Sequence, residues 1–147
     1  MNPSQINVRR MEPRDLPEVH RIQAASPEAS QWSPEEYLGY ESFVADREGG
    51  LAGFAVARRI PPGEVEVLNV ATDPGFRRRG TGAALLRALL ALSGEILFLE
   101  VRESNLAACE LYRSVGFAVV GRRKNYYPSL GGGTAPREDA IVMKMQK

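Results

Sequence analysis

The chain has 147 residues, of which 44% are hydrophobic and 25% are charged, and its formal net charge at pH 7 is +1. This length suits one domain with a sizeable core, so residues 1–147 are predicted to form a single domain. The balanced charge gives no general reason to expect direct nucleic-acid binding or attraction to a membrane. One cysteine excludes an intrachain disulfide framework, and one cysteine with one histidine argues against a His/Cys-rich metal site.

The N-terminus and the apolar runs give no targeting or membrane signal. Residues 1–5 are polar and lack the apolar core of a signal peptide. The longest apolar run, residues 83–92, is interrupted by Arg87 and is too short to span a bilayer. We therefore expect a cytoplasmic protein that uses no metal.

Two helix starts are predicted in the N-terminal third, after a short strand over residues 6–11. The first has Asp15 as its cap and Glu18 three residues later. The second combines Ser33 as the cap with Pro34 at the first helical position and a capping-box glutamate.

Two side chains of this region are candidates for a role in function. His20 falls on the first predicted helix and is the chain's single histidine, yet a surface or partly packed position is favoured over catalysis. Trp32 directly precedes the Ser33 cap, where it can staple the turn or form the wall of a groove, and stapling is favoured.

The middle of the chain reads as strands that lead into a basic turn. Residues 42–47 and 51–60 are predicted to form a hairpin, and residues 64–72 form a further strand rich in β-branched side chains. The turn, residues 73–82, then opens a helix of strong helix formers over residues 83–92.

This basic turn has the features of a phosphate site. The start of a helix presents unpaired backbone N–H groups and the positive end of the helix dipole to a ligand. The P-loop pattern fails because Thr81 follows Gly80 where a lysine is required, and the dinucleotide pattern fails because Leu85 replaces the third glycine. The alternative interpretation is a helix start whose arginines are merely solvated.

The C-terminal half continues the alternation of strands and helices. Residues 95–101 are mostly apolar and are expected to form a strand that is buried on both faces. The remaining predicted elements are a helix over residues 105–114, a strand from 117 to about 123, a loop over 125–137 and a strand over 138–145. This order predicts an α/β (α+β) fold with a central, mixed but mainly antiparallel sheet flanked by helices.

Two motifs resemble the signatures of the GNAT acyltransferases. The spacing Arg77-x-x-Gly80-x-Gly82, after a strand, resembles the family's acetyl-CoA signature. Residues 99–105, together with Leu111-Tyr112-x-x-x-Gly116-Phe117, are similar to its second motif.

Two further segments narrow the resemblance. Residues 125–128, Asn-Tyr-Tyr-Pro, and residues 137–140, Arg-Glu-Asp-Ala, resemble the bacterial Rim group, which acetylates the N-terminal alanine of a small-subunit ribosomal protein. The resemblance covers most of the chain after about Gly53. It implies a single-domain GNAT-like fold, acetyl-CoA as co-substrate and direct transfer to a protein or peptide N-terminus.

The resemblance also implies which residues bind the coenzyme. Backbone N–H groups of the turn hold the pyrophosphate, and the backbone at the end of the preceding strand pairs with the pantetheine arm and polarises the thioester carbonyl. Asn105 matches a position whose side chain contacts the pantetheine, although it also reads as a helix N-cap. The backbone positions are Val70, Ala71 and Thr72 on the strand, and Arg78, Arg79, Gly80, Thr81, Gly82 and Ala83 in the turn.

Glu100 and Tyr112 are the catalytic candidates. Glu100 lies among apolar strand neighbours, and such surroundings make a carboxyl group a better proton acceptor, although an ion pair with Arg102 or a nearby arginine is the alternative. Glu103 is the nearest rival but reads as solvated. Tyr112 can donate a proton to the departing thiolate, and core packing is its alternative. Cys109 is interpreted as inert helix packing.

The sequence predicts the acceptor substrate less specifically than it predicts the coenzyme. At pH 7 roughly 10% of an α-amine but only about 0.04% of a lysine amine is neutral, which favours a peptide N-terminus. Tyr126 and Tyr127, with Glu138 and Asp139, offer aromatic walls and carboxylates that could orient a basic peptide, and packing with surface charge is the alternative. The glycine-rich segment over residues 131–136 leaves the shape of this groove open. The alternative functions are a lysine or small-amine acetyltransferase and a non-catalytic coenzyme A-binding module.

Overall fold

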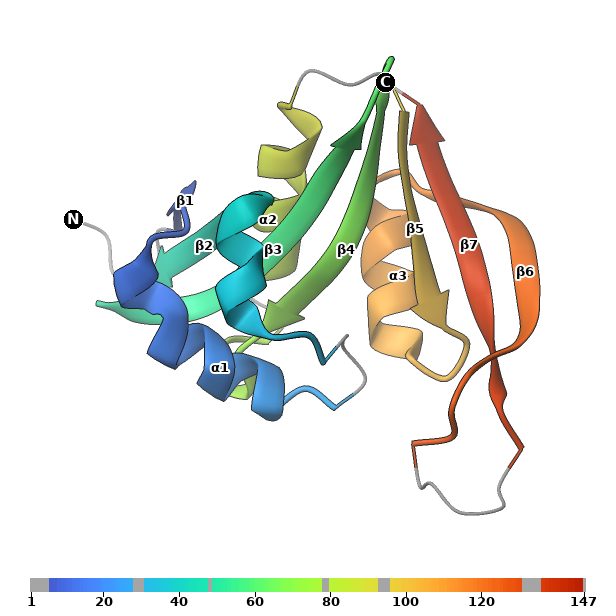
Figure 1. Ribbon diagram of the computed structural model, residues 1–147, viewed down its shortest axis with the longest axis horizontal. Helices are drawn as coiled ribbons and strands as arrows, with labels where there is room; N and C mark the ends of the chain where they lie inside the picture. The colour runs from blue at the N-terminus through green and yellow to red at the C-terminus, as the bar shows by residue number, and fades with distance from the viewer. Residues whose placement is uncertain are drawn as a thin grey trace.

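The computed structural model of the protein describes residues 6–27, 31–47, 49–77, 80–92, 96–130 and 136–146. Its seven-stranded sheet has the order β1-β2-β3-β4-β5-β7-β6 (Figure 1). The strands are β1 (Asn7–Arg10), β2 (Glu41–Arg47), β3 (Gly50–Ile60), β4 (Glu64–Thr72), β5 (Ile96–Arg102), β6 (Ala118–Tyr127) and β7 (Glu138–Gln146). The helices are α1 (Leu16–Ala24), α2 (Thr81–Leu90) and α3 (Leu106–Val115), with 3-10 turns η1 (Pro13–Asp15), η2 (Pro34–Gly39) and η3 (Pro74–Phe76).

Helices cover both faces of this sheet (Figure 1). The helix α1 and the turn η2 pack on one face of β2 to β4, in a core that includes Ile22, Tyr37 and Phe54. The helices α2 and α3 pack on the opposite face, in a core that includes Leu85 and Leu99. The β4–β5 pair is parallel, whereas the other neighbouring pairs of described strands are antiparallel. The predicted fold class is therefore confirmed.

The two N-terminal helix starts differ from the prediction. Asp15 directly precedes α1, but its carboxylate makes no cap bond, because it accepts hydrogen bonds from both terminal nitrogens of Arg9 at 2.8 Å and from the Glu12 amide at 2.8 Å. Ser33 precedes the 3-10 turn η2 and no α-helix, and its hydroxyl donates to Glu35 at 2.6 Å. In both places a side-chain partner competes with the backbone for the capping group.

Some boundaries and one burial pattern also differ. The helix α2 begins at Thr81, two residues before the predicted start, and β6 extends to Tyr127. The strand β5 is buried on one face only, since its residues alternate between buried and half-buried. The reason is that α2 and α3 cover one face of β5, whereas α1 and η2 cover the other face of the sheet only over β2 to β4. None of the helices in the described ranges has the length and apolarity needed to cross a bilayer.

The pairing between β4 and β5 ends before either strand does. Their register runs from Glu64↔Ile96 to Val67↔Leu99 and stops there. Beyond that point the two strands diverge toward their C-terminal ends (Figure 1). The backbone N–H and C=O groups on the facing edges of β4 and β5 therefore no longer bond each other, and a gap opens in the middle of the sheet.

The strand β3 packs tightly beside the C-terminal end of β4, which makes Gly53 a test of the packing. A methyl group on Gly53 would lie 2.7 Å from the Ala71 carbonyl oxygen and 3.2 Å from side-chain atoms of Leu85 and Thr81. We expect Gly53→Ala to lower the free energy of unfolding by about 1–3 kcal/mol, because the β4 backbone must move.

Gly39→Ala is the matched control, because a methyl group on Gly39 meets no atom within 4 Å. We expect this control to change the free energy of unfolding by less than about 0.5 kcal/mol. Urea unfolding followed by circular dichroism measures both variants, and equal effects would contradict the packing described for β3.

Candidate active site

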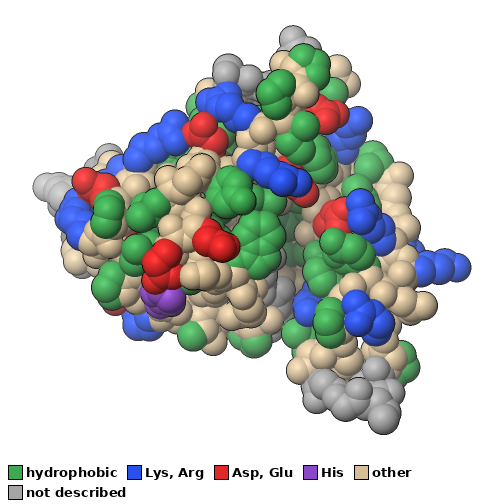
Figure 2. All heavy atoms as spheres, viewed as in Figure 1, with side chains coloured by type: hydrophobic (Ala, Val, Ile, Leu, Met, Phe, Trp, Pro, Cys, Tyr) green, Lys and Arg blue, Asp and Glu red, His purple; other side chains and the backbone are tan. Residues whose placement is uncertain are grey.

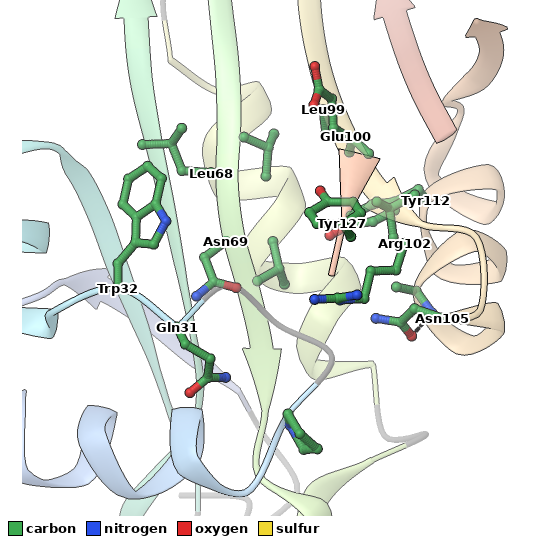
Figure 3. Close-up of a pocket in the computed structure, with 15 residues that line it drawn as sticks. Gln31, Trp32, Leu68, Asn69, Leu99, Glu100, Arg102, Asn105, Tyr112 and Tyr127 are labelled. Carbon is green, nitrogen blue, oxygen red and sulfur yellow. Dashed lines mark hydrogen bonds between the residues drawn. The ribbon is translucent and has the colours of Figure 1, made fainter. Parts of the chain in front are cut away.

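A cavity of about 270 Å³ occupies the gap between the diverging strands. Figure 2 shows it as a hollow with hydrophobic side chains on both sides. Figure 3 shows that its labelled lining residues form two groups that face each other. One group, Gln31, Trp32, Leu68 and Asn69, comes from β4 and the segment before η2, and the other, Leu99, Glu100, Arg102, Asn105, Tyr112 and Tyr127, comes from β5, α3 and β6.

Glu100 lines the cavity and is also engaged in an ion pair. Its side chain is 16% exposed, and its Oε1 lies 3.0 Å from Nε of Arg123. The predicted alternative partner, Arg102, instead bonds Glu138 at 3.1 Å and the Pro128 carbonyl at 2.7 Å. The rival Glu103 is half-exposed and pairs with an exposed arginine. Glu100 therefore lines the cavity and also forms the predicted alternative, an ion pair with a nearby arginine, so its role as the base stays a prediction.

Tyr112 lines the same cavity from α3. It is 7% exposed, and its ring packs edge-on against Phe117 with centroids 5.7 Å apart. Burial raises the pKa of Tyr112. The core-packing interpretation of Tyr112 is thus confirmed, and its role as a proton donor stays a prediction for a residue that also borders the cavity.

Tyr127 connects the two catalytic candidates electrostatically. Burial, and then the Glu100 carboxylate, raise the pKa of Tyr127 to about 12. Tyr127 in turn contributes to the raised pKa of Tyr112. The ring of Tyr127 is held under the guanidinium of Arg102, 4.6 Å from the ring centroid. Glu100 and Tyr112 thus border one space, with Tyr127 close to both.

The start of α2 has the backbone conformation that an anion site needs. Gly80 adopts φ +80°, a left-handed conformation that favours glycine, and the helix follows directly. The amides of Thr81, Gly82 and Ala83 lie in the first turn, where a helix offers no internal acceptor. Thr81 Oγ1 is buried and has no hydrogen-bond partner among the described residues.

Two predictions concern residues on either side of Gly80. The predicted contacts of Arg78 and Arg79 lie outside the described residues. A methyl group on Gly82 would lie 2.6 Å from a Leu111 methyl carbon, so the small size of Gly82 allows the close packing of α2 against α3, and its predicted backbone contact with the pyrophosphate stays a prediction.

The predicted coenzyme residues of β4 and α3 border the gap. Val70 lines the cavity, while Ala71 is buried and Thr72 pairs with Gly53 of β3. Asn105 also lines the cavity, and its Oδ1 accepts a hydrogen bond from the Ala108 amide at 3.2 Å. The capping interpretation of Asn105 is thus confirmed, and its contact with a coenzyme stays a prediction.

One wall of the cavity was missed or misread at the level of sequence. Trp32 is 40% exposed and lines the cavity, so that it forms a groove wall and does more than staple a turn. Asn69 was passed over, although a lone amide in the apolar run of β4 signals a buried polar contact. Gln31 and Leu68 carry no signal of this kind and reach the cavity through the fold alone.

The predicted acceptor groove is only partly assembled. Tyr127 lines the cavity, but Tyr126 stacks against Arg123 with 5.2 Å between centroid and guanidinium carbon. Glu138 accepts hydrogen bonds from Arg102 and Ser104, and Asp139 accepts them from Arg122 and the Asn125 amide. These carboxylates therefore anchor β6 and β7 and are not free to orient a basic peptide. Most of the glycine-rich segment lies outside the described residues.

The remaining candidates, His20 and Cys109, do not line the cavity. His20 is half-exposed, away from the cavity lining, and its Nε2 lies 2.7 Å from Glu35. Cys109 is buried in the core beneath α3, and burial raises the pKa of its thiol. Among the residues that the structure describes, no cluster of three or more His, Cys, Asp or Glu side chains is placed to hold a metal ion.

Comparison with known proteins identifies the class of this fold and site. Residues 7–117 match the acetyltransferase (GNAT) family, and the chain belongs to that family. It is 36% identical over 144 residues to the ribosomal protein bS18-alanine N-acetyltransferase of Escherichia coli, across 92% of this chain and 93% of that protein. It is 46% identical over 110 residues to the N-alpha-acetyltransferase RimI of Mycobacterium tuberculosis, across 71% of this chain and 66% of that protein.

A solved structure agrees with this assignment. The crystal structure of the ribosomal-protein-S18-alanine N-acetyltransferase from Escherichia coli has a TM-score of 0.80 and 34% identity, covering 97% of this chain and 94% of that chain. The chain is accordingly an acyltransferase with the GNAT fold.

The two roles of Asn105 can be separated by substitution. Asn105→Ala should lower the free energy of unfolding by about 1 kcal/mol, because the Ala108 amide loses its acceptor. Asn105→Ser keeps a capping oxygen and should retain nearly all of that stability. If the Asn105 amide also contacts the coenzyme, both variants should bind coenzyme A more weakly in calorimetric titrations. Unchanged binding by Asn105→Ser would leave this residue with capping alone.

Proposed function

We propose that this protein is an acetyl-CoA-dependent N-alpha-acetyltransferase that acetylates the N-terminal alanine of a small-subunit ribosomal protein. The observation that carries the proposal is the placement of Glu100 and Tyr112 on one cavity at the gap between β4 and β5. The names of the full-length relatives support the acceptor, since they cover nearly the whole chain.

The coenzyme is assigned to the side of the gap that α2 and α3 border. The first-turn amides of Thr81, Gly82 and Ala83, with Gly80 and the neighbouring Arg78 and Arg79, would hold the pyrophosphate. The unpaired edge of β4 at Val70, Ala71 and Thr72 would bond the pantetheine arm as an added strand would, with Asn105 on the other side. The buried Thr81 hydroxyl, which has no hydrogen-bond partner among the described residues, fits this assignment because it has hydrogen-bonding capacity to spare.

The acceptor is assigned to the opposite side of the gap, between Trp32 and Tyr127. Glu100 would accept the proton that the attacking amine loses, and a backbone N–H at the end of β4 would polarise the thioester carbonyl. Tyr112 would give its proton to the departing thiolate, because its phenol borders the same cavity as Glu100. The amine attacks the acetyl carbon directly, because the buried Cys109 is packed in the core.

A peptide panel tests the acceptor. The wild-type protein is incubated with labelled acetyl-CoA and peptides that begin with alanine and contain an internal lysine. Label should appear at the α-amine, and prior blocking of that amine should abolish transfer. Label that persists on lysine after blocking would favour the lysine acetyltransferase. Mass spectrometry of a small-subunit ribosomal-protein extract then identifies which N-terminus is modified.

The role of Glu100 is tested by Glu100→Gln, which removes the proton acceptor and keeps the shape. We expect kcat/KM to fall by about 10²–10⁴-fold, because no carboxylate remains to accept the proton of the attacking amine. Coenzyme A binding should stay unchanged. Kinetics like those of the wild type would reject Glu100 as the base.

Arg123→Gln is the matched control, because it breaks the same ion pair from the other end. If Glu100 acts as a base, this variant retains its carboxylate and keeps most of its activity. If the pair serves only structure, Glu100→Gln and Arg123→Gln should have equal effects on both activity and unfolding free energy.

A further inference from the structure

A buried cluster of polar side chains lies behind the Trp32 wall of the cavity, and the proposed chemistry does not use it. Gln23 of α1, Tyr37 of η2 and Asn69 of β4 are 6%, 0% and 6% exposed. The Tyr37 hydroxyl donates to Gln23 Oε1 at 2.5 Å and accepts from Asn69 Nδ2 at 3.1 Å. Asn69 Nδ2 also lies 3.4 Å from Gln23 Oε1.

Gln23 extends this cluster to the cavity wall. Its Nε2 donates to the backbone carbonyl of Trp32 at 2.6 Å. The Gln31 side chain also donates to the carbonyls of Gln23, at 3.3 Å, and Ser26, at 3.1 Å. Gln23 therefore joins α1, η2, β4 and the segment that supplies Gln31 and Trp32 to the cavity.

This segment depends on side-chain bonds for its position. Residues 31–33 belong to no helix or strand, so regular backbone hydrogen bonding does not fix the place of Trp32. The Trp32 carbonyl can only accept a hydrogen bond, and the Tyr37 hydroxyl is already directed at the other end of the Gln23 amide. A glutamine meets both demands at once, whereas a glutamate or a methionine does not.

We propose that Gln23 is a positioning residue of the acceptor site, which holds the Trp32 wall at a fixed distance from β5 through its bond to the Trp32 carbonyl. This inference rests on the assignment of the acceptor to the Trp32 side of the cavity. The coenzyme candidates lie on β4, α2 and α3 and receive no hydrogen bond from Gln23 among the described residues. Loss of the Gln23 bond consequently acts on acceptor binding and spares coenzyme binding.

The test combines kinetics with the fluorescence of Trp32, which is the chain's single tryptophan. Gln23→Glu removes the donor to the Trp32 carbonyl, and Gln23→Met removes both polar groups at similar length. Each should raise the KM for an alanine-terminated peptide about five- to tenfold, the factor that one lost buried hydrogen bond typically represents. The KM for acetyl-CoA should change by less than about twofold. Acrylamide should quench Trp32 more strongly in both variants.

A pH dependence distinguishes positioning from general loosening of the fold. Protonation of the carboxylate introduced by Gln23→Glu restores a donor to the Trp32 carbonyl. Relative to the wild type at each pH, the peptide KM and the quenching of Gln23→Glu should recover as pH falls, and those of Gln23→Met should not. Gln146→Glu, the same change on an exposed residue at the end of β7, is the matched control and should leave every readout unchanged.

The outcomes decide the inference in either direction. Equal increases in both KM values, or quenching and peptide KM like those of the wild type, would overturn it. If Gln23→Glu fails to fold, Tyr37→Phe replaces it, since the ring and its contact with Phe54 remain while the bonds of its hydroxyl to Gln23, Asn69 and the Trp32 backbone are lost. If the wild type transfers no acetyl group to the peptide, the proposed function fails, and the quenching of Trp32 still decides whether Gln23 positions the wall.

Discussion

The pairing between β4 and β5 ends early, and this break inside the sheet determines where the cavity lies. After Val67↔Leu99 the two strands separate inside the sheet, where neither edge can be covered by a further strand. Backbone groups on such edges need partners, and an extended ligand arm can supply them. The same divergence places the cavity between residues of β4 and residues of β5, while different helices pack on the two faces of the sheet.

The two walls of the cavity are stabilised by different means. On the β5 side, Arg102 bonds Glu138 and the Pro128 carbonyl while it covers the Tyr127 ring, so that three separate segments hold one another in place. On the β4 side a buried amide and hydroxyl cluster fixes an irregular segment. Exposed ion pairs contribute little free energy each, but buried hydrogen bonds that lack alternatives fix one geometry. Positional accuracy, more than added stability, explains why polar groups are placed behind the Trp32 wall.

Much of the fold could be predicted because its signals are local. Strand and helix order follow from periodicity, and the turn before α2 follows from Gly80 and the basic residues around it. The errors have local causes as well. Asp15 and Ser33 carry the right groups for caps, but Arg9 and Glu35 compete for those groups at distances set by the fold. The strand β5 reads as apolar enough for burial on both faces, yet the helix that would cover its second face stops at β4.

The acyltransferase motifs and the candidates Glu100, Tyr112 and Asn105 could be identified from the sequence, because their chemistry and spacing are contained in short segments. The surroundings of these residues come from the packing of distant segments. Arg123 reaches Glu100 because the register Arg102↔Ala140↔Arg123 carries β6 alongside β5 through β7. The Gln23 bond to Trp32 likewise depends on how α1 and η2 settle on the sheet. Such contacts join residues far apart in the chain, and no local pattern encodes the packing that brings them together.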